Sequence, residues 1–189
     1  MLTFKKKYYF IIEDIKDINL ENIKKNNKLS LIYRNKKKLK ERSFLVKFRK
    51  KCRLKCIKFY IANDIHLAVY LKADGVYLSA WNKTFKALNY KKNNFNIIGS
   101  AHNLKEVSLK FKQGCNSILY SKLFLVDYNK TSPFLGIIKF NNLILKHKNL
   151  IPFGGINLSN INKLNNVKCE GFALMSEIKK KPAIIRRLF

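Results

Sequence analysis

The chain has 189 residues, 47% of them hydrophobic, which excludes an intrinsically disordered protein and favours a single domain over residues 1–189 with a sizeable core. No apolar run reaches the ~18 residues that a transmembrane helix needs. The N-terminal stretch lacks the long apolar region and the small-residue cleavage site of a signal peptide. We therefore expect a cytoplasmic protein.

The formal net charge is +29, from 40 basic and 11 acidic residues. An excess of this size favours attraction to nucleic acid, anionic membranes or phosphorylated ligands. The lysines are spread over the whole chain, however, which favours solvated helix faces, and no RRM, zinc-finger or helix-turn-helix signature is present. We therefore do not expect a nucleic-acid partner, and attraction to phosphate groups or membrane surfaces stays open.

The four cysteines show neither a metal-binding nor a disulfide pattern. Cys52 and Cys56 are four residues apart rather than in a C-x-x-C motif, no histidine follows at zinc-finger spacing, and Cys115 and Cys169 are isolated. We expect reduced, partly buried thiols. The sequence does not define an oligomeric state.

Taken in chain order, eight short apolar segments predict β-strands. The segment 59–62 is typical: Asn63 and Asp64 follow its carboxyl end, a helical run comes next, and Gly75 leads into another strand. A strand–helix–strand unit with a crossover of ~15 residues forms a parallel pair. The predicted strands are 8–12, 29–33, 56–62, 76–78, 94–98, 116–120, 150–153 and 168–174.

Helical periodicity fills the intervals between these strands. In the basic amphipathic helix 39–52, Phe44, Leu45 and Phe48 are expected to face inward against a sheet; attachment to a membrane surface is the alternative. Asn103, three residues before Glu106, predicts a capping box. The expected helical segments are 14–23, 39–52, 65–71, 81–90, 104–112, 137–148, 157–165 and 176–187.

Eight alternating strands and helices, with no interrupting domain, predict an α/β fold, specifically a compact (β/α)8 TIM barrel. A doubly wound open sheet is the alternative, but no glycine-rich fingerprint follows the first strand. The longest loop, 121–136, has a length that is often functional.

Polar residues and glycines follow the predicted strands at what would be the active face of a barrel. Basic side chains, exposed glycine backbone and a serine at a helix start favour phosphate binding, and Asp64 suits a divalent cation. Tight turns, solvated charges and a capping histidine are the alternative interpretations. The residues are Arg34, Lys36, Asn63, Asp64, Ser79, Asn82, Ser100, His102, Ser121, Lys122, Asp127, Gly154, Gly155 and Ser176.

Four ordered segments of the chain resemble motifs of the thiamine phosphate synthase / TenI family of (β/α)8 barrels. They are IANDIHLAVYLKADGVYLS (61–79), IIGSAHNLKE (97–106), IPFGGIN (151–157) and GFALMSEI (171–178). They are similar to the family's INDxxxLAxxxxADGVHLG, IGxSxHxxxE, AIGGI and GVAVxSAI segments. The resemblance runs from about residue 8 to residue 178.

The resemblance implies an enzyme of thiamine biosynthesis, which joins hydroxymethylpyrimidine diphosphate to thiazole phosphate with release of diphosphate and the help of Mg²⁺. It implies that Arg34, Lys36 and Asn63 contact the diphosphate or pyrimidine, and that Ser100 contacts the leaving group. It further implies that Gly154, Gly155 and Ser176 form a phosphate cradle and that Asp64 supplies one Mg²⁺ carboxylate.

The chain differs from the family pattern at three positions near this expected site. Ile32 stands where the family has a glutamine that contacts the pyrimidine, Asn82 where a second Mg²⁺ carboxylate is expected, and Ser79 where a glycine follows the strand. A catalytically degenerate barrel that binds a phosphorylated thiazole or pyrimidine, as a regulatory or binding protein, is therefore the alternative function.

Overall fold

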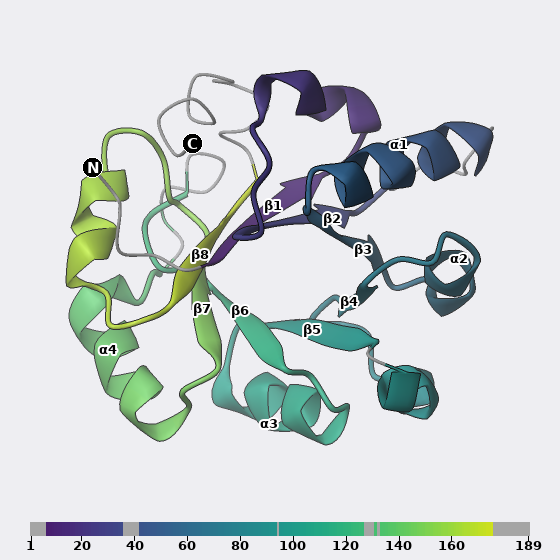
Figure 1. Ribbon diagram of the computed structural model, residues 1–189. Coiled ribbons are helices and arrows are strands. Elements are labelled where there is room, and N and C mark those ends of the chain that lie inside the picture. Colours follow the sequence, from purple (N-terminus) through teal and green to yellow (C-terminus); the bar gives the residue numbers. More distant parts are fainter. Residues whose placement is uncertain (1–6, 36–41, 94, 127–130, 132, 176–189) are drawn as a thin grey trace.

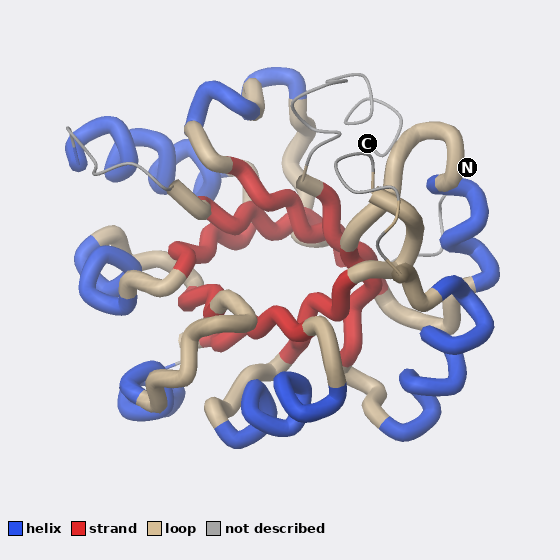
Figure 2. The backbone as a smooth tube through the Cα atoms, turned by 180° about the vertical axis from the view of Figure 1, so that it is seen from behind, coloured by secondary structure: helices blue, strands red, loops and turns tan. Residues whose placement is uncertain are grey.

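Eight parallel strands close into a barrel in the computed structural model, which describes residues 7–35, 42–93, 95–126, 131 and 133–175 (Figure 1). β1 pairs with both β2 and β8, which closes the ring and rules out the open doubly wound sheet. The strands form one ring, with helices and loops outside it (Figure 2). They are β1 (Lys7–Ile12), β2 (Leu29–Tyr33), β3 (Lys58–Ala62), β4 (Gly75–Leu78), β5 (Asn96–Ala101), β6 (Ser117–Ser121), β7 (Leu150–Phe153) and β8 (Gly171–Leu174).

The connections between the strands are shorter and less regular than in the sequence prediction. Within the described residues the α-helices are α1 (Arg42–Leu54), α2 (Ile65–Tyr70), α3 (Leu104–Lys112) and α4 (Gly136–Lys146). The other four connecting elements are 3-10 turns: η1 (Ile15–Asp17), η2 (Leu20–Asn22), η3 (Lys86–Asn93) and η4 (Ile161–Asn166). The predicted helix 176–187 lies outside the described residues.

The predicted helices 14–23 and 157–165 contain only short 3-10 helices, and two further helix predictions were wrong in detail. The predicted helix 81–90 begins only at Lys86, and Trp81 and Phe85 are 73% and 48% exposed instead of forming a buried face. On α1, Leu45 and Phe48 are buried as expected, but Phe44 is 54% exposed. An apolar residue at helical spacing need not face the core, because the neighbouring elements decide which stripe is covered.

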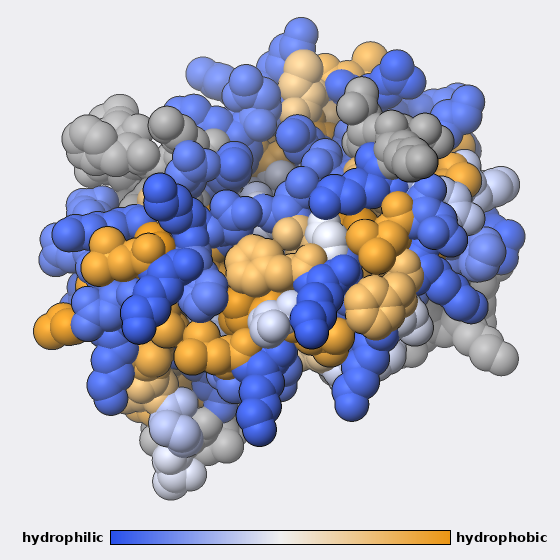
Figure 3. Space-filling view, turned by 90° about the horizontal axis from the view of Figure 1, so that it is seen from below, coloured by the Kyte–Doolittle hydropathy of each residue, from blue (hydrophilic) through white to orange (hydrophobic). Residues whose placement is uncertain are grey.

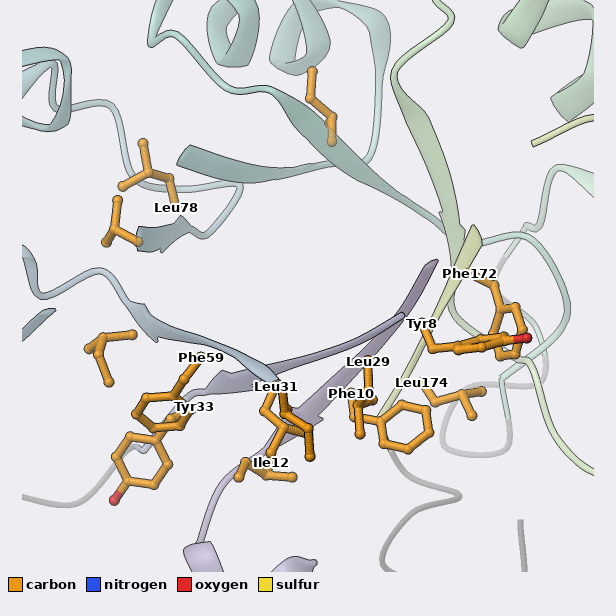
Figure 4. Close-up of a cluster of buried hydrophobic side chains, with 14 of the residues drawn as sticks. Tyr8, Phe10, Ile12, Leu29, Leu31, Tyr33, Phe59, Leu78, Phe172 and Leu174 are labelled. Atoms are coloured by element: carbon orange, nitrogen blue, oxygen red, sulfur yellow. The ribbon is translucent and has the colours of Figure 1, made fainter. Parts of the chain in front are cut away.

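The core has two layers, separated by the wall of the barrel. Side chains alternate across each strand, so every second residue faces the barrel axis and the others face the helices. Tyr9, Ile32, Tyr77 and Leu119 belong to the inner cluster. The outer cluster is larger, and its labelled members point away from the barrel axis toward the surrounding elements (Figure 4). This double burial explains why the strands read as continuous apolar runs.

Side-chain caps begin two of the helices, and the one at Asn103 confirms the sequence prediction. Asn103 Oδ1 accepts a hydrogen bond from Glu106 N at 2.9 Å, and Glu106 Oε2 accepts one from His102 N at 2.7 Å. Asp64 caps α2 in the same way, with Oδ1 accepting from Leu67 N at 2.9 Å. These caps fix the start of each helix directly after a strand.

The surface carries the charge excess in a dispersed form. On the face seen in Figure 3, hydrophilic side chains cover most of the surface and separate several apolar groups. Among the described helices, none has the length and apolar character needed to cross a membrane.

The four cysteines are free thiols, as expected, and differ in burial. Burial raises the pKa of Cys52 and of Cys115 to about 12, whereas Cys56 is exposed. Because the thiolate is the reactive form, we predict that Cys56 reacts with an aromatic disulfide reagent in the native protein. Cys52 and Cys115 should react only after denaturation. Mass spectrometry of peptides labelled before and after adding guanidinium checks this, and rapid native labelling of Cys52 would contradict it.

Candidate anion-binding site at the barrel mouth

A cavity of about 310 Å³ lies at the carboxyl ends of the strands. Its lining comes from the ends of β2, β5, β6, β7 and β8, which a parallel barrel brings to one mouth. Five of the residues that the sequence places after strands line this one cavity, although they come from four different strand ends; they are Arg34, His102, Ser121, Gly154 and Gly155. The apolar part of its wall includes Phe153 and Ile156.

Arg34 holds an incompletely satisfied guanidinium at this mouth. Its backbone N donates to Ile12 O at 2.8 Å, which fixes the residue beside β1. Its Nη2 lies 3.0 Å from Met175 Sδ and 3.9 Å from a Glu13 carboxylate oxygen. Nε is buried and has no hydrogen-bond partner among the described residues. A buried cationic N–H left unpaired is costly, and an anionic ligand with oxygen acceptors would satisfy it.

The glycine pair after β7 presents backbone to the same cavity. Both glycines have left-handed conformations, with φ of +87° for Gly154 and +73° for Gly155. Their carbonyls are engaged, since Gly154 O accepts from Phe124 N at 3.1 Å and Gly155 O from Asn160 Nδ2 at 2.7 Å. The N–H groups of Gly154, Gly155 and Ile156 show no acceptor among the described residues. Successive unpaired amides of this kind form an anion-binding concavity.

We predict that Gly155→Ala lowers the free energy of unfolding by about 2–4 kcal/mol, because left-handed strain adds to a steric clash. A Cβ on Gly155 would overlap the carbonyl oxygens of Phe124 and Leu125. Gly136→Ala is the matched control: its φ is +75°, but nothing lies within 4 Å of an added Cβ. For the control, urea unfolding should show a loss of about 1–2 kcal/mol in the free energy of unfolding. Equal losses of unfolding free energy at both positions would contradict the close approach of the 121–125 loop to Gly155.

Asn63, Ser79 and Asn82 form a closed hydrogen-bond network on the other side of the barrel. Asn63 Oδ1 accepts from Ser79 N at 2.9 Å and from Asn82 Nδ2 at 3.1 Å, while Asn63 Nδ2 donates to Ser79 Oγ at 2.8 Å. Asn82 Oδ1 in turn accepts from Thr84 N and Thr84 Oγ1, at 2.9 and 3.0 Å. The side-chain oxygens of Asn63 and Asn82 are therefore used to hold the β4 loop against β3.

A buried lysine supports this loop from behind. Lys110 on α3 has no exposed surface, and its Nζ donates to Ser79 O and Asn82 O, both at 2.7 Å, and to Gln113 Oε1 at 2.9 Å. Desolvation by burial lowers the pKa of this ammonium, while its three hydrogen bonds satisfy all of its donors. Lys110 thus fixes the loop that orders Asn63.

Asp64, the predicted metal ligand, has one carboxylate oxygen that could ligate a divalent cation. Its side chain is exposed and one carboxylate oxygen caps α2, which leaves Oδ2 with no partner among the described residues. No group of three or more metal-ligating side chains occurs in the described part of the chain. One carboxylate fits a Mg²⁺ that arrives chelated by a diphosphate, since Mg²⁺ keeps several waters and substrate oxygens, but it does not make a metal cage.

The remaining predicted residues fall in three places. Ser100, expected in the loop after a strand, lies within β5, is buried, and shares a hydrogen bond with Tyr77, because β5 continues through Gly99 to Ala101. It does not line the mouth cavity. Asn63 and Asp64 do not line it either. Lys36 and Ser176 lie outside the described residues.

Apart from the apolar wall, three lining residues had no assigned role in the sequence prediction. His102 and Ser121 were recognised only as following strands, and Met175 was not singled out. The signal for Met175 was its position directly after β8, one residue before Ser176. Lys110 was also missed, because one lysine among 40 basic residues carries no sequence signal of burial.

The structure defines a (β/α)8-barrel protein with a cavity at the carboxyl-terminal mouth of the barrel. The sequence profile of the family described as thiamine monophosphate synthase (TMP-TENI) matches residues 9–178. The chain belongs to this family.

Individual relatives agree with this assignment. The thiamine-phosphate synthase of Prochlorococcus marinus is 32% identical over 123 residues, which cover 64% of this chain and 35% of that protein. The thiamine-phosphate synthase of Flavobacterium johnsoniae is 28% identical over 148 residues, covering 72% of this chain and 70% of that protein. This chain thus matches about a third of the Prochlorococcus protein's length.

A solved structure shares the fold over the full chain. The thiamine phosphate pyrophosphorylase of Pyrococcus furiosus superposes with a TM-score of 0.74 at 19% identity, covering 100% of both chains. At this identity the likeness establishes the barrel fold.

Proposed function

We propose that the protein is a thiamine phosphate synthase, which joins hydroxymethylpyrimidine diphosphate to thiazole phosphate and releases diphosphate. Family membership supports the reaction class. The single structural observation that carries the proposal is the Arg34 guanidinium at the barrel mouth, whose buried Nε has no partner within the described part of the chain. A guanidinium at this position is suited to hydrogen bonding with the negatively charged oxygens of a leaving diphosphate.

The chemistry requires that negative charge be stabilised as diphosphate departs and that the two rings be held in line. Arg34 donates to the leaving diphosphate, where a preformed cation acts without reorganisation. The amides of Gly154 and Gly155 bind the phosphate of the thiazole, which orients its ring nitrogen toward the pyrimidine methylene. Phe153 and Ile156 supply apolar wall and exclude water from the reacting carbon.

Mg²⁺, when bound, neutralises diphosphate charge, and Asp64 is the residue that would hold it. We predict that Asp64→Asn raises the Mg²⁺ concentration for half-maximal activity by about tenfold, since one charged ligand is lost. Asparagine caps a helix as well as aspartate does, so the unfolding free energy should change little. Mg²⁺ titration of activity beside a thermal melt checks this. Unchanged Mg²⁺ dependence would remove Asp64 from the site.

A binding protein without turnover is the second candidate. Ile32, where a pyrimidine-contacting glutamine is expected, is fully buried in the inner barrel layer, and Asn82 Oδ1 is occupied by Thr84. Such a protein would bind the phosphorylated heterocycles at the same mouth but would not join them.

Incubation of the purified full chain with both substrates and Mg²⁺ separates the two functions. The synthase proposal predicts thiamine phosphate by chromatography, in amounts that exceed the enzyme concentration and grow linearly with it. Absence of product above a no-enzyme control would contradict turnover. Calorimetric binding of the pyrimidine diphosphate in that case would favour the binding protein.

A further inference from the structure

A second cavity, of about 390 Å³, lies at the opposite, amino-terminal end of the barrel. None of its lining residues lines the carboxyl-terminal mouth. Layers inside such barrels are usually filled by bulky branched side chains, and the amino-terminal face usually serves stability. A hollow at this end therefore departs from the rule of the fold.

The layer of residues at the amino-terminal end of the barrel is polar, which follows from the positions of polar residues in the strands. Five strands each place a polar residue two positions before an inward-facing residue, so the Cα–Cβ bonds of these five residues are directed toward the barrel axis. They are Lys7 before Tyr9, Ser30 before Ile32, Lys58 before Tyr60, Asn96 before Ile98, and Ser117 before Leu119. All five line the cavity.

Hydroxyl groups form the deep end of this cavity. Tyr9 and Tyr60 are about 95% buried, and their phenol groups share hydrogen bonds with Ser117 and Ser30 respectively. Burial raises the pKa of both tyrosines, so both remain neutral and retain their O–H donors at physiological pH. Hydroxyl groups orient readily toward an acceptor oxygen.

Ammonium groups form the rim. Lys7, Lys28 and Lys58 line the cavity, and no carboxylate belongs to its lining. Lys7 pairs with Glu170 at 2.9 Å, whereas Lys28 and Lys58 form no ion pair among the described residues. The charges of Lys28 and Lys58 are therefore not offset by a carboxylate among the described residues, and an anion in the cavity is attracted to both.

We propose that this amino-terminal cavity binds a small phosphate-class oxyanion, such as pyrophosphate or a phosphate monoester, at a site separate from the carboxyl-terminal mouth. Lysine ammonium groups of the rim bind its charge, and the serine, asparagine and tyrosine side chains below donate to its oxygens. The proposal does not depend on the synthase reaction.

The test titrates pyrophosphate into the full chain by calorimetry at about 0.15 M salt, where attraction between distant surface charges is screened. It uses an Arg34→Gln background, which removes the guanidinium from the proposed mouth site and leaves only its glycine amides. Adding Lys28→Gln and Lys58→Gln together should weaken the remaining binding by about tenfold or more, since each lysine supplies a charge-assisted contact.

Lys105→Gln with Lys139→Gln is the control pair, because both lysines are exposed, line neither cavity and change the net charge equally. This pair should leave affinity within about twofold. Equal weakening by both pairs would reduce the effect to net charge and overturn the proposal. So would absence of pyrophosphate binding in the Arg34→Gln background. A parallel titration with inorganic phosphate shows whether one phosphate group suffices.

Discussion

Arg34→Gln is expected to lower kcat/KM for the pyrimidine diphosphate by about 10²–10³-fold, the cost typical of losing one preorganised donor to developing charge. The guanidinium lines the mouth, and its buried Nε has no hydrogen-bond partner among the described residues. Because leaving-group charge grows as the reaction proceeds, kcat should fall as well as affinity. Steady-state kinetics with pyrophosphate detection measures both.

Two further variants sharpen this result. Arg34→Lys keeps the charge but not the planar fork, so we expect an intermediate loss of about tenfold. Glu13→Gln removes the carboxylate 3.9 Å from the guanidinium and should change activity by no more than about twofold, because so long an ion pair is weak. An Arg34→Gln enzyme that retained more than half of the wild-type kcat/KM would contradict the assignment.

Lys110→Ala is expected to lower the free energy of unfolding by about 3–5 kcal/mol. The change empties the space of a fully buried side chain and removes a donor from the carbonyls of Ser79 and Asn82 and from Gln113. Buried acceptors without a donor cost more than the hydrogen bond itself is worth. Urea unfolding followed by circular dichroism gives the value, provided that the transition is two-state.

Two controls separate the hydrogen bonds from helix propensity and volume. Lys112→Ala, an exposed position at the end of the same helix, should change stability by less than about 0.5 kcal/mol. Lys110→Met fills most of the space without a donor, so we expect it to lower the free energy of unfolding by about 2–3 kcal/mol. If Lys110→Met were as stable as wild type, the ammonium would contribute nothing to the β4 loop.

The sequence predicts the barrel because strand alternation is a strong signal. Strands buried on both faces read as continuous apolar runs, and eight of them separated by short helical segments fit few other folds. The bounds are less accurate: β5 continues through Gly99 and Ser100 to Ala101, because pairing with β6 outweighs the tendency of glycine to end a strand. The predicted helix 81–90 fails because its start is held by the Asn82–Thr84 turn instead.

The site is only partly predictable for a geometric reason. Position after a strand selects residues at the correct end of the barrel, and Arg34, Gly154 and Gly155 do share one cavity. Position alone does not show which side chains are already engaged, and Asn63 and Asn82 are occupied with each other. Nor does it show that Lys110, a residue of the outer helix layer, reaches into the β4 loop.

The central claim is that Arg34 and the Gly154–Gly155 pair belong to one site for the reaction products. A crystal structure of the full chain with thiamine phosphate, pyrophosphate and Mg²⁺ tests it most directly. We expect the phosphate ester within hydrogen-bond distance of the Gly154 and Gly155 amides, and pyrophosphate oxygens against the Arg34 guanidinium. Product density elsewhere, with the mouth filled by solvent, would contradict this assignment.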